Sequence, residues 1–584
     1  MHPRLHYAAA PRRKIDWRLT QTLSLFVLLC LAAPDLWRHA SADERVSQMT
    51  TTTRGLVVSD SAPASDVGAA ILSQGGNAVD AAVATALALA VTLPEAGNLG
   101  GGGFMLVCPG DGREPVCIDY RETAPGQARA DMFSLGDSRQ GHKVVGVPGT
   151  LRGLELAHRR YGKLPWKTLA EPAVRLAAEG FVLGPRLAHD LNEITKSSAD
   201  FSELRRVFGK EGGAGGWVPA DRLVQPELAA TLRQLADEGP SVFYEGKIAQ
   251  QIVAEMERGG GLITLADLAG YQAKERAVLR GRYRGYEILG APPPSSGGIA
   301  TIEALQMLEP FELRQYGRGS ARAQHLIIEA LRRAFCDRAR WLGDPDFVSV
   351  PSRLASPKYA RERGADIDVA QATRSERLAP EIELAAEGSD TTHFSVIDAA
   401  GMAVANTYTL EHSYGSRVVV RGAGFLLNNE MADFNWKPGH TDRRGNIGTP
   451  PNTIAPGKRM LSSQSPTIVL RDGRPVLVTG SPGGRTIIST AVCVLVNKLE
   501  YDMDVRDAVD WPRLHHGWFP DLVLLEGAED LAMASVLKEL TELGHAIERK
   551  PHRQGSANSI WIDLESGLRT GVADRRRGGK ASGE

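Results

Sequence analysis

Residues 391–410 read TTHFSVIDAAGMAVANTYTL, two strand-like runs joined by the turn sequence DAAG at 398–401. With a two-residue turn at its tip, this hairpin places Thr391 opposite Tyr408 and one residue from Thr409. Two hydroxyl groups are thereby predicted to meet at the beginning of a strand. Taken alone, this is also the pattern of an ordinary hairpin, because threonine favours strands.

A second hairpin turns at Asp472-Gly473, and its last strand ends in TGSPGG at 479–484. A helix is predicted directly afterwards, over 486–499. The N–H groups of Gly483 and Gly484 at the start of such a helix are suited to stabilise an oxyanion. The two hairpins together therefore indicate a nucleophile and an oxyanion-binding loop.

Three further segments carry side chains that suit a zwitterionic amino acid. Ser462 and Ser463 are short hydroxyl donors for a carboxylate, and Arg121 can pair with a carboxylate through two N–H groups. Glu430 and Asp433 lie three residues apart and suit an ammonium group. Individually these features are unspecific, and Arg121 with its acidic neighbour is also the pattern of a surface ion pair. Together they predict a pocket for a zwitterionic amino acid facing an acyl-transfer centre.

The remaining sequence favours one large globular body. The 584 residues are 42% hydrophobic and 23% charged, which excludes a disordered chain, a collagen-like repeat and a coiled coil. The net charge of −1, without a block of like charges, argues against nucleic-acid binding. The sequence has no GxSxG elbow, no phosphate-binding P-loop and no HExxH zinc motif.

Predicted helices and strands share the chain without a linker. Helices are expected at 78–92 and 321–341, and helical patterns dominate from about 150 to 340. Residues 360–390 are polar and irregular. The predicted strands are 104–108, 116–120, 391–398, 403–410, 424–428, 467–470 and 475–479. This order predicts a mixed α/β (α+β) fold.

Two pairs of residues leave alternatives open. Cys108 and Cys117 flank a turn-rich segment, so they are either a disulfide across a hairpin or two half-buried thiols. The five cysteines include no CxxC, which argues against a thiolate zinc site. His515-His516 suggests a metal pair, but adjacent histidines of a strand point to opposite sides, which favours a structural role.

Residues 1–42 have the pattern of a signal peptide. Basic residues precede an apolar run at 23–33, and Ala40-Ser41-Ala42 offers a cleavage site before Asp43. The apolar run is short for a membrane span, although a retained anchor is the alternative. No other stretch approaches eighteen apolar residues, so we expect a mature protein without a membrane span, periplasmic or secreted.

Several blocks of this sequence resemble the signature blocks of γ-glutamyltranspeptidases, in the same order. The resemblance runs from about residue 50 to the end at 584. The blocks are Gly75–Ala82, Gly100–Phe104, Asp119–Pro125, Thr391–Val396, Leu426–Phe434, Leu461–Ser463 and Gly480–Gly484.

The resemblance implies an N-terminal-nucleophile hydrolase with an αββα sandwich, made as an inactive precursor. It implies that the chain cuts itself between Asp390 and Thr391 into a large subunit, 43–390, and a small subunit, 391–584, which form one joint domain as a heterodimer. A threonine hydroxyl is a weak nucleophile, and the freed α-amine of Thr391 would act as its base.

Roles for individual residues follow from the resemblance. Thr391 attacks the γ-carbonyl of glutathione or a related γ-glutamyl amide, and Thr409 orients Thr391. Gly483 and Gly484 form the oxyanion hole. Water, an amino acid or a dipeptide then takes the acyl group, and no metal or organic cofactor is needed. The implied donor-binding residues are Arg121, Ser462 and Ser463 for the α-carboxylate and Glu430 and Asp433 for the α-ammonium.

Two positions depart from the family pattern. Glu411 replaces a usual asparagine, so a third carboxylate joins the ammonium site, where it either strengthens binding or leaves one acid protonated. Arg444 replaces an aromatic residue in the expected lid at 438–448, which leaves acceptor preference open. The alternatives in function are a related acylase (cephalosporin, glutaryl or poly-γ-glutamate type) and a non-enzymatic binding protein.

Overall fold

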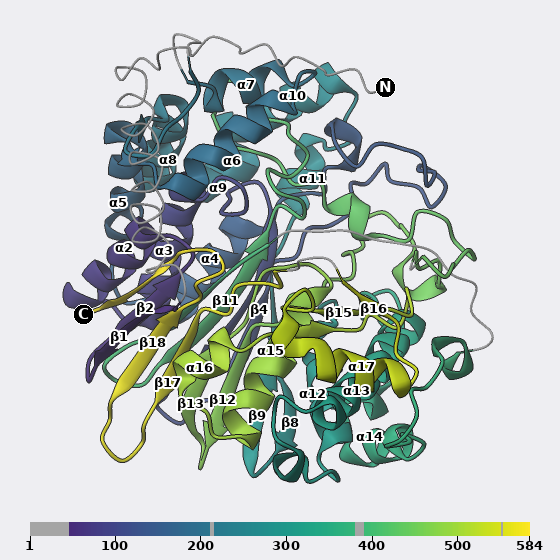
Figure 1. Ribbon diagram of the computed structural model, residues 1–584. Helices are drawn as coiled ribbons and strands as arrows, with labels where there is room; N and C mark the ends of the chain where they lie inside the picture. The colour runs from purple at the N-terminus through teal and green to yellow at the C-terminus, as the bar shows by residue number, and fades with distance from the viewer. Residues whose placement is uncertain (1–45, 211–214, 380–390, 445, 550–552) are drawn as a thin grey trace, which may run out of the picture. The chain divides into compact units, whose positions relative to one another are not determined.

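The computed structural model describes residues 46–210, 215–379, 391–444, 446–549 and 553–584 (Figure 1). Residues Ser47–Glu584 form one compact unit. The predicted signal peptide, 1–42, and Asp390 of the predicted cleavage site lie outside the described residues. Within the described ranges, each helix is too short or too polar to cross a membrane.

Two seven-stranded antiparallel sheets form the centre of this unit. Each sheet combines strands that precede and strands that follow residues 380–390. The first sheet has the order β19 (Lys580–Gly583), β2 (Leu56–Ser59), β10 (Thr392–Ile397), β11 (Ala403–Thr409), β3 (Gly102–Cys108), β4 (Val116–Asp119), β7 (Lys274–Ala277). The second has the order β1 (Gln48–Thr52), β18 (Arg569–Ala573), β17 (Ser559–Ile562), β13 (Arg474–Thr479), β12 (Thr467–Arg471), β9 (Tyr286–Gly290), β8 (Leu279–Tyr283).

Helices cover the outer face of each sheet (Figure 1). The first sheet is covered by helices of the first half of the chain: α2 (Ala62–Ser73), α3 (Ala78–Thr92), α4 (Thr150–Tyr161), α5 (Trp166–Glu179), α8 (Pro226–Glu238). The second is covered by α12 (Gly297–Leu308), α13 (Ala321–Trp341) and α15 (Thr486–Leu495). The smaller helices are α6 (Pro185–Lys196), α7 (Ser202–Phe208), α9 (Ser241–Glu245), α10 (Lys247–Gly259), α11 (Leu265–Gly270), α14 (Pro357–Gly364), α16 (Val505–Asp510), α17 (Ala534–Glu542).

Strand β2 shows how the two-residue period of a strand divides the core. Leu56 and Val58 point between the two sheets, whereas Val57 packs against the helices outside. The remaining strands form two small sheets. One pairs β5 (Phe181–Val182) with β6 (Arg222–Leu223), and the other contains β14 (Leu514–His515), β15 (Val523–Leu525) and β16 (Ile547–Glu548).

Most predicted elements are present, with three corrections. The 424–428 strand is absent from the described structure, where Leu426 and Leu427 make only isolated bridges. Cys108 and Cys117 lie on paired strands, but Cys117 lies opposite Leu106, and both cysteines are buried free thiols. The helix predicted at 486–499 is α15 followed by a π-helical turn, Val496–Glu500.

The register of the first hairpin differs by one residue from the sequence prediction. The loop holds three residues, because Asp398 pairs with Met402 and Gly401 takes a φ of +93°. Thr392 therefore lies opposite Tyr408. Continued by one residue, this register places Thr391 directly opposite Thr409.

Candidate active site

One pocket contains both threonines of the first hairpin. Thr391 lies immediately before β10 and Thr409 ends β11, and their exposed fractions are 4% and 2%. The pocket is lined by Arg121, Arg338, Thr391, Thr409, Glu411, Asp433, Ser462, Ser463, Gln464, Gly484, Arg485 and Ile487. Eight of the ten predicted site residues thus lie in the wall of one pocket. Of the other two, Gly483 directly precedes Gly484 in the chain, and Glu430 pairs with Arg121.

Backbone contacts fix the two threonines. Arg577 donates to the carbonyl oxygen of Thr391 at 3.2 Å. The Thr409 hydroxyl accepts the N–H of Glu411 at 2.8 Å. This contact holds the Thr409 hydroxyl at the end of β11, across from Thr391, the residue immediately before β10.

The glycine loop after β13 enters the pocket at Gly484. Gly483 and Gly484 have φ values of +123° and +55°, a backbone conformation that favours glycine. The carbonyl of Gly483 accepts the N–H of Thr486, the first residue of α15, at 3.1 Å. Gly480 has a different reason to be glycine, since a Cβ there would lie 2.4 Å from the His393 ring.

Arg121 lies at the bottom of the pocket as the centre of an ion-pair cluster. Its Nη1 lies 2.6 Å from Glu430 and 3.4 Å from Glu122, and its Nη2 pairs with Asp433. Arg121, Glu122 and Glu430 are fully buried, so the surface ion pair considered from the sequence is wrong for Arg121 and Glu122. The cluster places one cation among three carboxylates.

Burial shifts the protonation of these acids. Desolvation raises the pKa of Glu122 to about 8, although the Arg121 charge opposes this shift. Desolvation likewise holds the pKa of Glu430 and of Glu411 well above the usual range, and repulsion by Asp433 adds to both shifts. The third carboxylate predicted at Glu411 therefore joins the acid group, and burial rather than like-charge repulsion is the main reason for its protonation.

Glu411 is held by its neighbours. Its carboxylate accepts the side-chain N–H of Asn429 at 2.8 Å and lies 3.2 Å from His412. Its φ of +80° is unusual for a residue with a side chain. Local backbone strain at a pocket residue is typical of sites where position matters more than stability.

Four pocket residues were not predicted from the sequence: Arg338, Gln464, Arg485 and Ile487. Arg338 comes from α13, and its Nη2 donates to the hydroxyl of Ser463 at 3.2 Å. Gln464 directly follows the Ser462-Ser463 pair, and Arg485 directly follows the glycine loop, so proximity to these motifs was a usable signal. Arg338 lies far from every motif in sequence, and only the packing of α13 brings it here.

The predicted lid residue Arg444 lies away from the pocket wall. Its side chain is 84% exposed and pairs with Asp442 at 3.1 Å. Among the described residues of 438–448, none lines the pocket. The substitution at Arg444 therefore places a solvated ion pair on this loop.

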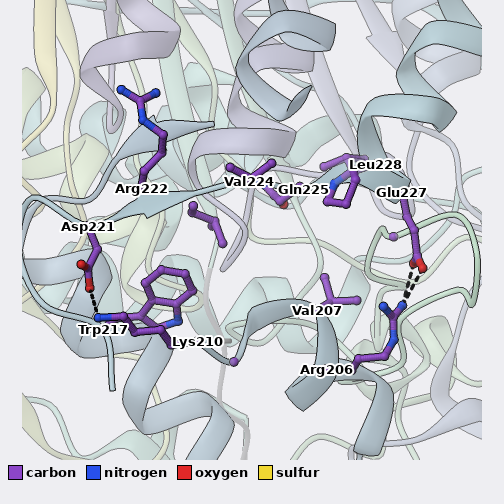
Figure 2. Close-up of a pocket in the computed structure, with 14 residues that line it drawn as sticks. Arg206, Val207, Lys210, Trp217, Asp221, Arg222, Val224, Gln225, Glu227 and Leu228 are labelled. Atoms are coloured by element: carbon purple, nitrogen blue, oxygen red, sulfur yellow. Dashed lines mark hydrogen bonds and ion pairs between the residues drawn. The ribbon is translucent and has the colours of Figure 1, made fainter. Parts of the chain in front are cut away.

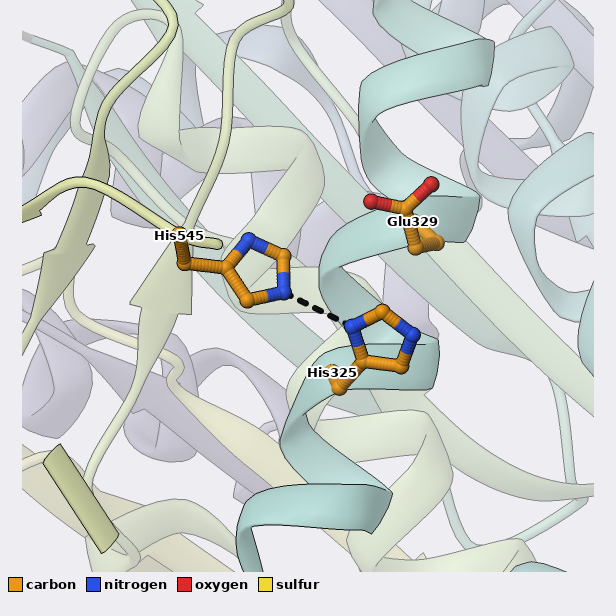
Figure 3. A group of neighbouring side chains, drawn as sticks. All are labelled: His325, Glu329 and His545. Carbon is orange, nitrogen blue, oxygen red and sulfur yellow. Dashed lines mark hydrogen bonds between the residues drawn. The ribbon is translucent and has the colours of Figure 1, made fainter. Parts of the chain in front are cut away.

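The described residues include one group with the composition of a metal site, His325, Glu329 and His545 (Figure 3). His325 Nε2 lies 2.8 Å from the carbonyl of Asp368 and therefore carries a hydrogen, which leaves Nδ1 as an acceptor for His545 Nε2 at 2.7 Å. Arg332 in turn donates to His545 Nδ1 at 3.3 Å. These hydrogen bonds occupy the lone pair of each histidine that a metal ion would need, so this group of side chains does not fit a metal ion.

The predicted structural role of His515-His516 agrees with their separate contacts. His515 Nδ1 lies 2.8 Å from the Ser489 hydroxyl, and His516 Nε2 lies 3.1 Å from Asp521. Burial lowers the pKa of His516 to about 4, so both histidines are neutral partners inside the fold.

A larger cavity of about 480 Å³ opens beside α7 and α8 (Figure 2). Four of its charged side chains pair with one another, Arg206 with Glu227 and Lys210 with Asp221, each at 2.7 Å, and Arg222 donates to the carbonyl of Gly180 at 2.7 Å. The residues that line this cavity include none of the predicted site residues.

Comparisons with known proteins extend over nearly the whole chain. The family model described as Gamma-glutamyltranspeptidase matches residues 64–584. The glutathione hydrolase proenzyme of Escherichia coli (strain K12) is 43% identical over 543 residues, 91% of this chain and 92% of that protein. The Acylase ACY 1 proenzyme of Pseudomonas sp. (strain SE83) is 38% identical over 545 residues, 90% and 93% of the two chains. The crystal structure of cephalosporin acylase from Bacillus halodurans matches with a TM-score of 0.80 at 26% identity, covering 92% of this chain and 97% of that one.

Proposed function

Because this chain belongs to the γ-glutamyltranspeptidase family, we propose that it is a glutathione hydrolase and γ-glutamyltransferase with Thr391 as nucleophile. The observation that carries this proposal is the pocket itself. It places Thr391 and Thr409 on adjacent strands, opposite a glycine loop and beside an ion-pair cluster suited to an amino acid.

Self-cleavage would prepare the nucleophile. The Thr391 hydroxyl attacks the carbonyl carbon of the preceding residue, and the acyl group shifts from nitrogen to oxygen. The shift breaks the carbon–nitrogen bond and frees the α-amine of Thr391, and water then hydrolyses the ester, which restores the Thr391 hydroxyl and leaves a carboxylate on Asp390. The products are the large and small subunits of an N-terminal-nucleophile hydrolase, a heterodimer in an αββα sandwich.

In the first catalytic step the freed α-amine accepts the proton of the Thr391 hydroxyl. The oxygen attacks the γ-carbonyl carbon of the donor, and Thr409 holds the hydroxyl in position. Negative charge develops on the carbonyl oxygen, which the N–H groups of Gly483 and Gly484 stabilise. The carbon–nitrogen bond breaks, and the departing amine takes the proton from the α-ammonium of Thr391.

The second step releases the γ-glutamyl group from its ester with Thr391. Water gives glutamate, and the amine of an amino acid or dipeptide gives a new γ-glutamyl amide. The acceptor loses a proton to the same α-amine, which restores the free hydroxyl of Thr391. No step requires a metal or an organic cofactor.

Donor recognition follows from the charges of the pocket. Glu430 and Asp433 face the donor α-ammonium, with Glu411 beside them. Arg121, Ser462 and Ser463 face the α-carboxylate. In the absence of donor, Arg121 and the two acids pair with one another, so a zwitterion exchanges these internal ion pairs for its own.

An acylase with the same machinery is the second candidate. The identity to the Acylase ACY 1 proenzyme and the likeness to cephalosporin acylase favour it. The pairing of Glu430 and Asp433 with Arg121 argues for the γ-glutamyl assignment, because a glutaryl group lacks the ammonium that Asp433 would bind.

We also propose that residues 1–42 are a signal peptide and that the mature enzyme is periplasmic or secreted. The basic residues, the apolar run at 23–33 and the Ala40-Ser41-Ala42 sequence support this assignment.

Intact masses under denaturing conditions test the nucleophile first. We expect the wild type to give two chains that meet between Asp390 and Thr391, and the Thr391→Ala variant to give one. Cleavage rates of γ-glutamyl and glutaryl p-nitroanilide then test the substrate. Faster cleavage of the glutaryl compound contradicts the γ-glutamyl assignment and favours the acylase, and a single wild-type chain contradicts the self-cleaving mechanism.

A further inference from the structure

One arginine reaches the main chain of Thr391 without lining the pocket. Arg577 lies in the turn between β18 and β19, and its Nη1 donates to the carbonyl oxygen of Thr391 at 3.2 Å. The pocket wall does not include Arg577. This cation therefore contacts the nucleophilic residue from outside the cavity in which a donor would bind.

An acid and a second arginine hold Arg577 in place. Its Nη1 lies 3.5 Å from the carboxylate of Glu95, which follows α3 and is 5% exposed. Glu95 is fixed in turn, because its main-chain carbonyl accepts the N–H of Tyr414 at 2.9 Å and its carboxylate pairs with Arg186 of α6. Arg186 also donates to the main-chain carbonyl of Arg577 at 3.2 Å. Both the main chain and the side chain of Arg577 are thereby anchored.

Asp60, a buried acid directly after β2, holds the next residue of the nucleophile strand. Its carboxylate accepts the hydroxyl of Thr392 at 3.2 Å, the hydroxyl of Ser556 at 2.6 Å and the side-chain N–H of Asn558 at 2.9 Å. Burial raises the pKa of Asp60, and the charge of Arg577 opposes this rise. The beginning of β10 is thus held by a cation and by an acid.

The charge of Arg577 acts at short range on the freed α-amine. The amine nitrogen and the carbonyl oxygen of Thr391 belong to one residue, so a cation that contacts the oxygen also lies near the nitrogen. A nearby positive charge disfavours protonation of an amine. An α-amine has an unperturbed pKa of about 7.7–8.0, so at neutral pH an unaided amine is mostly protonated and does not accept the hydroxyl proton.

We infer that Arg577 is a positioning residue that holds Thr391 through its carbonyl oxygen and keeps the freed α-amine unprotonated. This inference rests on the proposed self-cleavage and on Thr391 as nucleophile. Glu95 limits the effect, because its charge offsets part of the charge of Arg577.

Other charged side chains near Thr391 also influence its α-amine. Asp60 and Arg186 lie on the side of Arg577, and the rest line the pocket: Arg121, Arg338, Arg485, Glu411 and Asp433. All of these residues stay the same in the variants that test Arg577 and Glu95. A difference between those variants therefore reports the substituted group.

The pH dependence of kcat/KM for γ-glutamyl p-nitroanilide tests this inference, because its acid limb reports the pKa of the base in the free enzyme. We expect Arg577→Gln to raise this apparent pKa by about 0.5–1 unit, since a cation near the amine is lost. The plateau above the limb falls about 5-fold, as for one lost hydrogen bond. Arg577→Lys returns the charge, so we expect its acid limb within about 0.3 unit of the wild type.

Glu95→Gln gives a shift of the opposite sign. It keeps the shape of the side chain and removes the charge that offsets Arg577, so we expect the apparent pKa to fall by about 0.3–0.5 unit. The matched control is Arg575→Gln, two residues before Arg577, which removes an exposed cation that pairs with Asp510 at 3.4 Å. We expect this control to leave the acid limb unchanged.

Intact masses give the cleaved fraction of each variant before its kinetics are measured. If Arg577→Gln does not cut itself, Glu95→Gln decides, because it leaves Arg577 in the chain and changes only the net charge beside Thr391. A lowered apparent pKa in Glu95→Gln then supports the inference, and an unchanged or raised one overturns it.

Two further outcomes overturn the inference. An acid limb of Arg577→Gln that coincides with the wild type means that Arg577 does not act on the amine. An equal shift in Arg575→Gln assigns the effect to net charge instead of to the contact with Thr391. Failure of the proposed function is a separate result, because then the wild type itself shows no cut before Thr391 or releases no p-nitroaniline.

Discussion

The acid-rich pocket around Arg121 and the histidine cluster on α13 are both buried, and both combine arginines with carboxylates. At the pocket, one oxygen each of Glu122 and Glu411 and both oxygens of Glu430 have no hydrogen-bond partner within the described structure, although Glu430 forms an ion pair with Arg121. In the histidine cluster, by contrast, the side-chain donors and acceptors of His325, Glu329, Arg332, Arg333 and His545 are matched among the described residues. An unmatched buried acceptor costs free energy, so the acids of the pocket carry a cost that the histidine cluster avoids.

The histidine cluster serves the fold. His325 and Arg332 hold the segment that leads toward residue 379, through the carbonyl of Asp368 and the hydroxyl of Ser375. Arg332 also pairs with Asp521, on the other side of the predicted cleavage site. The histidine cluster thus joins two parts of the sequence, whereas we propose that the ion pairs of the pocket are exchanged for those of a bound zwitterion.

Removal of Arg121 gives the largest expected effect on stability. Arg121→Gln removes the cation that pairs with Asp433 and the hydrogen bonds that Arg121 donates to its buried neighbours, and we expect a loss of about 3–5 kcal/mol in the free energy of unfolding. Urea unfolding followed by circular dichroism measures it. Arg113→Gln removes an exposed ion pair with Asp111 and is the control, with an expected change of less than about 0.5 kcal/mol. Equal stability of the two variants contradicts the ion-pair cluster.

Asp433→Asn tests the pocket as a binding site. We expect kcat/KM for the γ-glutamyl anilide to fall about 10- to 100-fold, because the ammonium loses a charged partner. The glutaryl anilide, which has no ammonium, stays within about 3-fold. The matched control is Asp442→Asn, an acid that pairs with Arg444 outside the pocket wall. Parallel losses for both anilides argue against Asp433 as the ammonium partner.

His545→Ala tests the histidine cluster as a structural element. The change removes one hydrogen-bond partner from each of His325 and Arg332, and we expect the free energy of unfolding to fall by about 1–3 kcal/mol. Steady-state kinetics with the γ-glutamyl anilide stay unchanged. A change in KM without a change in the free energy of unfolding contradicts the structural role of the histidine cluster.

Glu122 gives a different kind of effect, a pH dependence of stability. Its pKa is raised from 4.5 to about 8, so between these values the folded protein holds a proton that the unfolded chain releases. The contribution of Glu122 is therefore fully present below pH 4.5 and is lost as pH rises toward 8. We expect Glu122→Gln to flatten this decline in urea unfolding at pH 5, 6.5 and 8. A wild-type stability that rises between pH 5 and 8 by the same amount in both proteins contradicts the raised pKa.

Local pattern was sufficient to predict most elements of the fold. The helices 78–92 and 321–341 have the predicted bounds, because their apolar periodicity and caps are local features. The hairpin register was displaced by one residue, since the backbone at Gly401 rather than residue spacing decides the turn. The prediction of a strand at 424–428 was wrong, because an apolar run does not reveal whether a partner strand lies beside it.

The chemistry of the site was predictable only where residues lie close in sequence. The serine pair, the two acids and the glycine loop were recognised as short patterns. Arg338 was missed, because its place in the pocket depends on how α13 packs against α12. The contacts of Arg121 were also beyond the sequence, which does not tell a surface ion pair from a buried cluster.

The mixed origin of the two sheets has a consequence for assembly. Strand β10 lies between β2 and β11, and β11 in turn lies beside β3, so segments from both sides of residues 380–390 alternate in one sheet. Two such halves cannot separate as ordinary subunits do, because each would expose strand edges and half of the core. After the proposed cut, dissociation is therefore the same event as unfolding, so the stability of the fold depends on the concentration of the two chains.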